Sequence, residues 1–570
     1  MRNFLALSLT LLFGASAYGA NAPQADAADS QWWKHAVIYE IYPRSFADSN
    51  GDGIGDLNGI IKHLDYLQEL GVNAIWMTPF YPSPQVDFGY DISDYRAIDP
   101  QYGSMTDFDH LVAEAKKRNI RMINDLVLNH TSDQHPWFLE SKSSRTNPKA
   151  NWYVWQDGKP GGQPPNNWIS LFGHSAWQFD PKRDQYYYHE FYVQQPDLNW
   201  RDAQMKNAMW DVVRFWMDKG VSGFRLDAIT SLFEDPQFRD EKVMPGKNAY
   251  GDPIVSREYT DNLPEVNTVL QELRQVTNKY PGSVLIGETY VQSSKDLLKL
   301  YGTQTKPELQ LPMDTQFGFV NHLSADGFRQ KLVAAETELD GHTPLFVFDN
   351  HDNNRSWNRY GDGKHNEEIA KLVATLLLTP RATALIYYGE ELGMYEDTPK
   401  RKEDVKDPIG IKGWPKEKGR DGERTPMQWN GDTDAGFSTA KKTWLPIEAD
   451  YQMRNVSAES RRPDSLLNYY KTLIRLRNEN PALRDGEFVL VNGTDNNVLS
   501  FLRKTNGGQT VLVAVNCSPE SRTVGYNFAP QGVNGSEGKT LIGSFSKAGQ
   551  ITKLSKFTIP AYGSYVGEVQ

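Results

Sequence analysis

The stretch AQMKNAMWDVVRFWMDKGVSGFRLD, residues 203–227, decides the fold. Its first part, residues 203–219, places apolar side chains three and four positions apart, which predicts an amphipathic helix. A short apolar run, Gly223–Leu226, follows the helix and predicts a buried strand. A helix that leads directly into a short buried strand is the repeating unit of a parallel α/β sheet. Arg225 and Asp227 place polar groups at the end of this strand.

The same alternation of helix and strand continues in both directions. Short β-branched or apolar runs predict eight strands, at Val37–Tyr42, Ala74–Thr78, Arg121–Leu128, Gly223–Leu226, Val284–Gly287, Leu311–Asp314, Leu345–Asp349 and Ala384–Tyr388. Helical periodicity lies between them, at Ile60–Leu70, Asp107–Asn119, Ala203–Lys219, Leu263–Lys279 and Glu367–Thr379. Eight such units indicate an α/β fold of the (β/α)₈ TIM-barrel type, in which the chemical residues follow the C-terminal ends of the strands.

Two segments interrupt the alternation. Residues 131–200 are rich in Trp, Tyr, Gly, Pro and Asn without a helical period, which indicates an inserted domain after strand 3, and residues 390–450 form a long excursion after the eighth strand. After a helix at Ser465–Asn478, short alternating strands predict a C-terminal antiparallel β-sandwich. The expected domains are a signal peptide over 1–22, a barrel over 23–130 and 201–478, an inserted domain over 131–200 and the sandwich over 479–570.

Composition and charge narrow the class of partner. The 570 residues carry a formal net charge of −11 with no long basic run, which argues against nucleic acid and anionic membranes as partners. Residues 1–22 combine Arg2, an apolar run and small residues, which is typical of a secretory signal. We therefore expect an exported protein, periplasmic or secreted, with no membrane anchor after cleavage and with small neutral ligands.

Four of the predicted strand ends carry polar side chains. They are Asp125, Asn129 and His130 after the third strand, Arg225 and Asp227 on the fourth, Glu288 after the fifth, and His351 and Asp352 after the seventh. Burying like charges on one rim is unfavourable unless the site uses them. The sequence therefore predicts a functional site at this rim.

The segments around these residues resemble signature regions of the α-amylase family of glycoside hydrolases (family 13). The resemblance is carried, in order, by DLVLNH (125–130), GFRLD (223–227), GE (287–288) and FDNHD (348–352). QPDLN (195–199) resembles a marker of the branch that holds oligo-1,6-glucosidases and α-glucosidases. The likeness implies a hydrolase of α-glucosides that needs no organic cofactor.

The expected chemistry uses two carboxyl groups. Glycoside hydrolysis passes through an oxocarbenium-like state, and carboxyl groups about 5 Å apart permit a covalent glycosyl intermediate with retention. Asp227 is the predicted nucleophile, because Arg225 two residues earlier points to the same face of the strand and favours its ionised form. Glu288 is the predicted acid/base, with a pKa raised by Asp227 and Asp352. The resemblance implies that Asp352, His130 and His351 contact the same glucose.

Two further segments carry substrate-binding residues implied by the resemblance. DFGYD (87–91) resembles the family's substrate segment, in which Tyr90 stacks on the terminal sugar and Asp91 binds its hydroxyls. GRDGERTPMQW (419–429) resembles a loop that brings an arginine to the non-reducing end, with Arg420 preferred and Arg424 second. A pocket closed in this way behind one glucose predicts an exo-acting enzyme.

The segment DSNGDGIGD (48–56) places oxygen ligands at alternate positions around glycines, a pattern that suits a hard cation. The matching loop of this branch binds Ca²⁺ away from the chemistry. The resemblance therefore implies a structural Ca²⁺ site, with Mg²⁺ as the other candidate ion. Its ligands would be Asp48, Asn50, Asp52, the Ile54 carbonyl and Asp56. The alternative is a metal-free Asn-Gly/Asp-Gly turn.

Ala228, the residue after the nucleophile, bears on linkage preference. Relatives that prefer α-1,6 bonds tend to carry Val there, so the sequence favours an α-1,4-specific α-glucosidase acting on maltose-like substrates, with transglycosylation as an accompanying activity. The alternatives are an oligo-1,6-glucosidase, a glucoside isomerase that makes trehalose or isomaltulose, and a non-catalytic carbohydrate-binding homologue. The expected assembly is a monomer or a small homo-oligomer.

Overall fold

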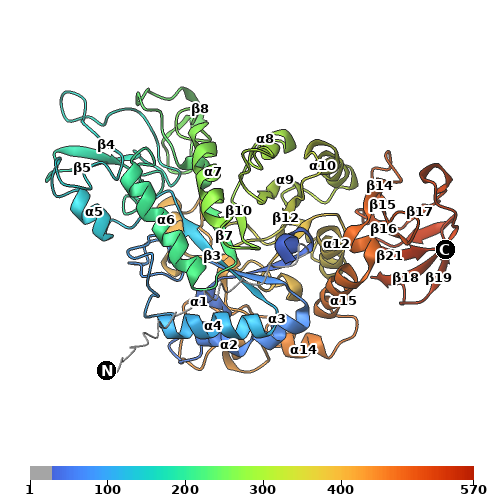
Figure 1. Ribbon diagram of the computed structural model, residues 1–570. Coiled ribbons are helices and arrows are strands. Elements are labelled where there is room, and N and C mark those ends of the chain that lie inside the picture. Colours follow the sequence, from blue (N-terminus) through green and yellow to red (C-terminus); the bar gives the residue numbers. More distant parts are fainter. Residues whose placement is uncertain (1–28) are drawn as a thin grey trace, which may run out of the picture.

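The computed structural model describes residues 29–570, so the predicted signal peptide over 1–22 lies outside the described residues. Eight parallel strands close a barrel in the order β1-β13-β12-β11-β10-β7-β3-β2 (Figure 1). The strands are β1 Val37–Ile41, β2 Ala74–Met77, β3 Arg121–Val127, β7 Gly223–Asp227, β10 Val284–Gly287, β11 Leu311–Asp314, β12 Leu345–Val347 and β13 Thr383–Tyr387. Each lies within two residues of its predicted bounds. The predicted TIM barrel is therefore confirmed.

Helices cover the outside of the barrel. They include α2 Leu57–Lys62, α3 Leu64–Leu70, α4 Met105–Lys117, α6 Ala203–Asp218, α7 Glu265–Thr277, α8 Ser294–Lys299, α10 Ala325–Glu338 and α12 Asn366–Leu378. The prediction of one helix over Ile60–Leu70 is wrong, because the chain breaks at His63 between α2 and α3. The His63 ring stacks on Trp429 with 3.6 Å between ring centroids. This tertiary contact is not visible in the helical period.

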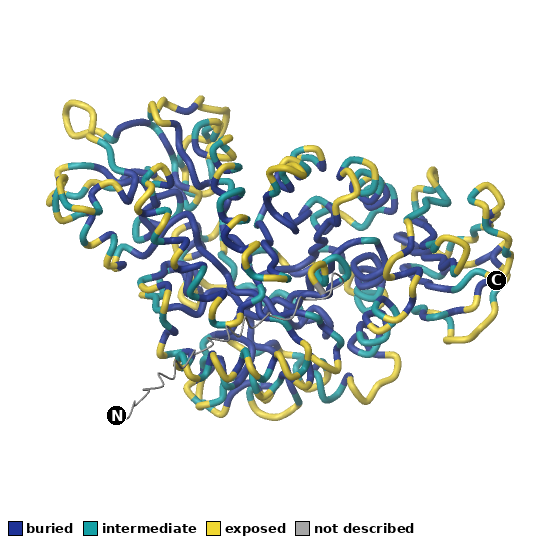
Figure 2. The backbone as a smooth tube through the Cα atoms, in the orientation of Figure 1, coloured by how far each residue is buried: buried dark blue, intermediate teal, exposed yellow. Residues whose placement is uncertain are grey.

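Two apolar layers hold the barrel together, because side chains alternate across each strand. Ile38, Trp76, Ile123 and Ile286 belong to a cluster that fills the barrel interior. Alternate residues such as Tyr39 belong to the larger cluster between strands and helices. Figure 2 shows the buried strands at the centre and the exposed backbone on the outer helices and loops.

The inserted segment after β3 carries a small antiparallel sheet of order β4-β6-β5, formed by Trp155–Gln156, Gln185–Tyr188 and Trp177–Asp180. A bridge pairs His130 with Asp197, so the segment leaves and rejoins the barrel at one place. A second excursion, which the sequence did not predict, follows β7. It contains the exposed hairpin β8–β9, Val243–Lys247 and Pro253–Val255. The excursion packs on the insertion, since the Trp168 indole donates to the Arg239 carbonyl.

The C-terminal part is an antiparallel sheet domain on the far side of the barrel from the insertion (Figure 1). Its main sheet has the order β14-β15-β16-β21-β18-β19, and a two-stranded sheet, β17-β20, packs on it. The bounds are β14 Glu487–Leu490, β15 Val498–Lys504, β16 Thr510–Asn516, β17 Arg522–Val524, β18 Glu537–Gly543, β19 Ile551–Lys553, β20 Phe557–Ile559 and β21 Ser564–Val569. The helix α15, Leu466–Glu479, leads into this domain. Over residues 29–570, no helix combines the length and apolarity needed to span a membrane.

Candidate active site

The polar side chains at the ends of β3, β7, β10 and β12 surround one cavity of about 260 Å³. It is lined by Asp87, Tyr90, His130, Phe172, Phe191, Asp227, Ala228, Glu288, Tyr290, Asp352, Ile409 and Arg420. All three predicted catalytic carboxylates therefore face the same space. This placement follows from parallel strands, whose C-terminal ends meet at one edge of the barrel.

Arg225 is the electrostatic centre of the cavity floor. It is 1% exposed. Its Nη1 lies 2.6 Å from Asp227 Oδ1 and its Nη2 lies 3.0 Å from Glu288 Oε1. Nη1 also lies 3.1 Å from both oxygens of Asp125. One guanidinium thus brings the predicted nucleophile and acid/base together and offsets part of their mutual repulsion.

The two predicted catalytic carboxyl groups, Asp227 and Glu288, both have raised pKa values. Burial raises the pKa of Asp227 to about 7 against the opposing effect of Arg225. Burial is also the main cause that raises the pKa of Glu288, and Asp227 and Asp352 raise it further. The Ala228 amide donates to Glu288 Oε2 at 2.8 Å, which fixes the orientation of that carboxyl group. A pair of raised carboxyl pKa values can hold one proton near neutral pH, as acid–base work requires.

Asp352 is held ionised. Burial by itself would raise its pKa, but His351, Arg420 and Arg424 keep it well below the ordinary value. His351 Nε2 lies 3.1 Å from Asp352 Oδ2, and its Nδ1 lies 2.7 Å from Oε1 of the buried Glu40. Burial alone would lower the pKa of His351, but the two carboxylates raise it to about 9. His351 is therefore an imidazolium at neutral pH.

Arg420 closes one end of the cavity, and Arg424 lies behind it. Arg420 lines it and bridges Asp352 and Asp87, with Nη1 and Nη2 each 2.8 Å from a carboxylate oxygen. Asp407 forms an ion pair with the same guanidinium, with 2.7 Å between Asp407 Oδ2 and Arg420 Nε. Arg424 is buried one layer deeper, where it donates to the His351 carbonyl and to Asp352 Oδ1. Of the two predicted arginines, Arg420 is the one at the cavity surface.

The structure does not bring Asp91, a predicted substrate-binding residue, to the cavity surface. Its carboxylate is fully buried, where it accepts the amides of Val86 and Asp87 and the hydroxyl of Ser83. These bonds shape the loop that carries Asp87, and Asp87 reaches the cavity. Both acids belong to one five-residue segment. The sequence spacing therefore could not show that Asp91 bonds the loop backbone while Asp87 lines the cavity.

The remaining predicted contacts converge on the cavity. The Tyr90 hydroxyl donates to Asp125 Oδ2 at 3.0 Å and lies 2.7 Å from His351 Nε2. His130 Nε2 lies 3.0 Å from the amide nitrogen of Gln195, which also donates to Asp87 Oδ2. Gln195 thus ties the inserted segment to the cavity wall.

Sequence reasoning missed several residues of the site. They are Asp87, Glu40, Phe172, Phe191 and Tyr290. Asp87 and Tyr290 lie within three residues of predicted positions, so their neighbourhood was a usable signal. Glu40 lies within β1, and nothing in the strand pattern distinguishes it from its neighbours as a site residue. Phe172 and Phe191 come from a segment without any periodic pattern, and only the fold of the insertion brings them to the cavity.

The predicted metal loop, residues 48–56, is built from Asx turns. Asp48 Oδ1 accepts the amides of Asn50 and Gly51, Asn50 Oδ1 accepts that of Asp52, and Asp52 Oδ1 accepts that of Ile54. Asp56 accepts from Ser49 and caps α2 through the Gly59 amide. Within residues 29–570, no group of three or more His, Cys, Asp or Glu side chains is gathered as a metal site. The donor set of the loop itself is entirely oxygen.

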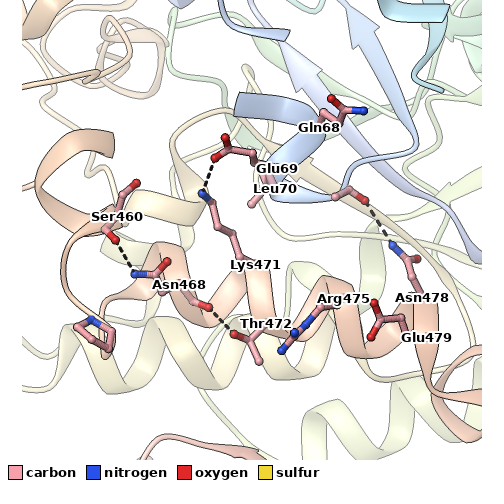
Figure 3. A pocket seen from close by; sticks show the side chains of 12 residues that line it. Gln68, Glu69, Leu70, Ser460, Asn468, Lys471, Thr472, Arg475, Asn478 and Glu479 are labelled. Carbon is pink, nitrogen blue, oxygen red and sulfur yellow. Dashed lines mark hydrogen bonds and ion pairs between the residues drawn. The ribbon is translucent and has the colours of Figure 1, made fainter. Parts of the chain in front are cut away.

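A larger cavity of about 640 Å³ lies between α3 and α15 (Figure 3). Polar side chains of the helix surfaces line it, and Lys471 crosses it to Glu69 at 3.3 Å. Gly71 of its wall shortly precedes β2, so the cavity lies toward the N-terminal ends of the strands. The strand-end carboxylates are at the opposite ends, and we therefore assign the chemistry to the smaller cavity.

Comparison with known proteins agrees with this geometry. Residues 40–486 match the family described as "Alpha amylase, catalytic domain". The chain belongs to the α-amylase family. This match confirms the resemblance drawn from the four strand-end segments.

Within the α-amylase family, the chain has close relatives along most of its length. It is 44% identical over 510 residues to a "Probable alpha-glucosidase" of Rhizobium meliloti (strain 1021), covering 87% of this chain and 91% of that protein. It is 40% identical over 522 residues to an "Oligo-1,6-glucosidase" of Parageobacillus thermoglucosidasius, covering 86% and 91%. The solved structure of the "alpha-glucosyl transfer enzyme, XgtA" superposes with a TM-score of 0.85 at 39% identity, covering 95% and 99%. This α-amylase family member is a glycoside hydrolase.

Proposed function

We propose that this chain is a retaining, exo-acting α-glucosidase that releases glucose from the non-reducing end of short α-glucosides. The closed end of the cavity carries this proposal, because Arg420 bridges Asp87 and Asp352 behind a space of about 260 Å³. A cleft for internal bonds of a long chain would stay open at both ends. The names of the two relatives, α-glucosidase and oligo-1,6-glucosidase, support the same substrate class.

The proposed reaction has two steps. Asp227 attacks the anomeric carbon while Glu288 gives its proton to the glycosidic oxygen, so the leaving sugar departs neutral and a glucosyl–Asp227 ester forms. Glu288 then removes a proton from water, the water oxygen attacks the same carbon, and Asp227 is released. Two inversions retain the α configuration. Arg225 stabilises both carboxylates through this cycle, from 2.6 Å and 3.0 Å.

Substitution of the two acids in the presence of azide tests their roles. Asp227→Ala and Glu288→Ala should each lose turnover of 4-nitrophenyl α-glucoside by several orders of magnitude. Azide should rescue both, giving β-glucosyl azide with Asp227→Ala and α-glucosyl azide with Glu288→Ala, because the first enters in place of the nucleophile and the second in place of water. Exchanged anomers would reverse the two assignments. Turnover that survives Asp227→Ala would rule out this nucleophile.

We propose α-1,4 bonds as the preferred linkage. Ala228 lines the cavity beside the nucleophile, where its small side chain leaves room for the next sugar. A single methyl-scale difference changes discrimination by only about 1–3 kcal/mol. The test compares kcat/KM for maltose, isomaltose, trehalose and sucrose, with NMR of the products. Higher kcat/KM on isomaltose would favour an oligo-1,6-glucosidase, and sucrose or maltose converted to an isomeric disaccharide would favour an isomerase.

We also propose a structural Ca²⁺ at the loop of residues 48–56, with Mg²⁺ as the other candidate. The alternating oxygen donors support it, since hard cations prefer such ligands. Ca²⁺ added to chelator-treated protein should raise the midpoint of thermal unfolding and give a calorimetric binding signal, and Asp52→Ala should remove both, because binding to the native state stabilises it. Neither Ca²⁺ nor Mg²⁺ producing heat or a thermal shift would refute the site.

Export through residues 1–22 is a further proposal, supported by the apolar run and the small residues that follow it. N-terminal sequencing of the protein recovered from the periplasm or medium should begin within or just after Ala15–Ala22. Retention of Met1 in cytoplasmic protein would contradict it.

A further inference from the structure

We propose that a second cavity, on the other side of the segment that carries Arg420 and Arg424, binds a neutral pyranose such as glucose. This rear cavity has a volume of about 580 Å³, which lies within the range of small-molecule sites, about 300–1,000 Å³. The segments 397–406 and 442–446 supply most of its lining. The site goes beyond the proposed function, because a sugar bound there lies apart from the catalytic carboxylates.

The rear cavity is separated from the catalytic cavity of about 260 Å³ by a single chain segment. The two cavities are lined by different residues. Arg420 lines the catalytic cavity, whereas its neighbour Asp421 lines the rear cavity. Arg424 is buried behind Arg420, whereas its neighbour Thr425 lines the rear cavity. Residues 420–425 therefore form the partition between the two cavities.

Hydrogen bonds join the rear cavity to the closed end of the catalytic cavity. The Asp421 carboxylate accepts the Lys406 amide at 2.5 Å and the Asp407 amide at 3.1 Å. Asp407 Oδ2 in turn lies 2.7 Å from Arg420 Nε. A sugar in the rear cavity would thus contact Lys406 and Asp421, which bond to the backbone of the ion-pair partner of Arg420.

The lining of the rear cavity has the chemistry of a site for a neutral pyranose. A sugar ring has apolar faces and a rim of hydroxyl groups, and Pro399, Trp444 and Pro446 offer apolar surface to such faces. Charged groups of both signs supply donors and acceptors for the hydroxyl groups. They are Lys400, Lys406, Lys442, Asp397, Glu403, Asp404 and Asp421. Because positive and negative groups are interspersed, the lining suits a neutral polar ligand better than an ion.

Two of these charged groups are available to a ligand, and they come from the two different segments of the lining. Within the described part of the chain, residues 29–570, neither the Lys442 ammonium nor the Asp397 carboxylate forms a hydrogen bond or an ion pair. A bound pyranose could therefore bond both groups without displacing an existing partner. Their substitution removes contacts to the sugar and leaves the contacts of the fold in place.

The test measures glucose binding while the catalytic cavity is filled. Glu288→Gln treated with 5-fluoro-α-glucosyl fluoride should form a lasting glucosyl–Asp227 ester, because the base that activates water is absent. Calorimetry should then show one glucose bound per protein. Adding Lys442→Ala or Asp397→Ala should weaken this binding by about tenfold, which corresponds to the loss of one hydrogen bond. Lys441→Ala, an exposed neighbour outside the lining, is the matched control and should leave the binding unchanged.

Two results would overturn the rear-cavity proposal. One is a trapped protein that binds no glucose, and the other is binding that neither Lys442→Ala nor Asp397→Ala weakens, which would place the glucose elsewhere. With Glu288 intact, both substitutions should keep the wild-type kcat/KM for 4-nitrophenyl α-glucoside, because neither residue lines the catalytic cavity.

Failure of the proposed function has a different signature, because the protein would then gain no mass from the glucosyl fluoride. In that case, glucose titration of the untreated protein decides the binding claim alone. Binding that Lys442→Ala and Asp397→Ala weaken and Lys441→Ala does not would support the rear cavity, and equal binding by all three variants would refute it.

Discussion

Glu40 shows how a single residue on one strand can set the charge of a group on another. Its carboxylate is fully buried on β1, and the His351 imidazole that it contacts follows β12. The same imidazole lies against Asp352 and the Tyr90 hydroxyl. The charge state of His351 therefore depends on both carboxylates, and it in turn affects Asp352 and Tyr90, which line the cavity.

Replacement of Glu40 by Gln should lower the pKa of His351 from about 9, because one of the two carboxylates that stabilise the imidazolium is lost. The imidazole would then lose its proton at a lower pH, so kcat/KM should fall at a lower pH on the alkaline side. NMR titration of the imidazole and the pH profile of kcat/KM measure the two effects. Glu391→Gln, a buried acid that bonds Tyr39 and Tyr66, is the control. An unchanged His351 pKa in Glu40→Gln would contradict the role.

Asp87 and Asp91 should differ in what their loss affects. Asp87→Asn removes a charged partner of Arg420 at the cavity, so kcat/KM should fall by about 10- to 100-fold with little change in the midpoint of thermal unfolding. Asp91→Asn places an amide where a buried carboxylate accepts three bonds, so it should first lower the unfolding midpoint. Steady-state kinetics and thermal unfolding of both variants separate the two. A normal midpoint with impaired kcat/KM in Asp91→Asn would instead support the prediction that Asp91 binds the substrate.

At the scale of elements, the site forms because neighbouring barrel strands end at the same level of the barrel. β7 and β10 pair in register from Gly223–Val284 to Leu226–Gly287, so Asp227 and Glu288 follow adjacent positions at the rim. β3 pairs with β7 on the other side, with Asp125 opposite Arg225. The ion pairs at the cavity floor are thus a direct result of strand register.

Gly223 at the start of β7 is required by this register. A Cβ atom at this position would lie 2.0 Å from the Val284 carbonyl oxygen, closer than any real contact. Gly223→Ala should therefore push β7 and β10 apart, costing more than about 2 kcal/mol of stability and lowering kcat/KM through the displaced Asp227 and Glu288. Soluble yield, thermal unfolding and kcat/KM test this. Gly341→Ala, where a Cβ meets no atom within 4 Å but φ is 77°, separates the steric effect from ordinary backbone strain. Equal losses in both variants would argue against the register explanation.

At the scale of the whole molecule, the C-terminal sheet and the barrel share one core. Phe501 and Val513 of this sheet belong to the same apolar cluster as the barrel helices. The Arg503 Nη1 donates to the Thr379 carbonyl at 2.6 Å just after α12, and the Tyr469 and Ser564 hydroxyls lie 2.8 Å apart. The sheet is thus continuous with the packing of the barrel.

Removal of residues 487–570 should leave a barrel that does not fold stably, because it exposes the apolar side chains of α12 and α15 to water. A fragment of residues 29–486 should be insoluble or lack turnover, whereas 29–570 should retain both solubility and activity. Arg503→Met tests the polar part of the same interface, since it leaves the buried Thr379 and Gly486 carbonyls without their donor. A soluble 29–486 fragment with full turnover would show that the two parts are independent.

The sequence by itself determined the barrel and the rim at which its polar strand-end side chains meet. Strand and helix periods are local properties, and residues at strand ends keep their place whatever surrounds them, so Asp227, Glu288 and Asp352 could be placed at one rim of the barrel from the chain alone. The sequence also located the inserted segment and the C-terminal strands, because both change the local pattern of apolar and turn residues.

Only the tertiary structure decided which side chains of irregular segments reach the cavity. Asp87 and Asp91 differ in burial because a loop folds around one of them, and no period describes that loop. Glu40 and His351 are 311 positions apart and meet because the barrel closes β1 against the strand beside β12. A cavity lined by Leu171, Arg257 and Tyr290, among other residues, combines the insertion, the excursion after β7 and the loop that follows β10. Contacts between such distant segments depend on packing in three dimensions, which local sequence patterns do not encode.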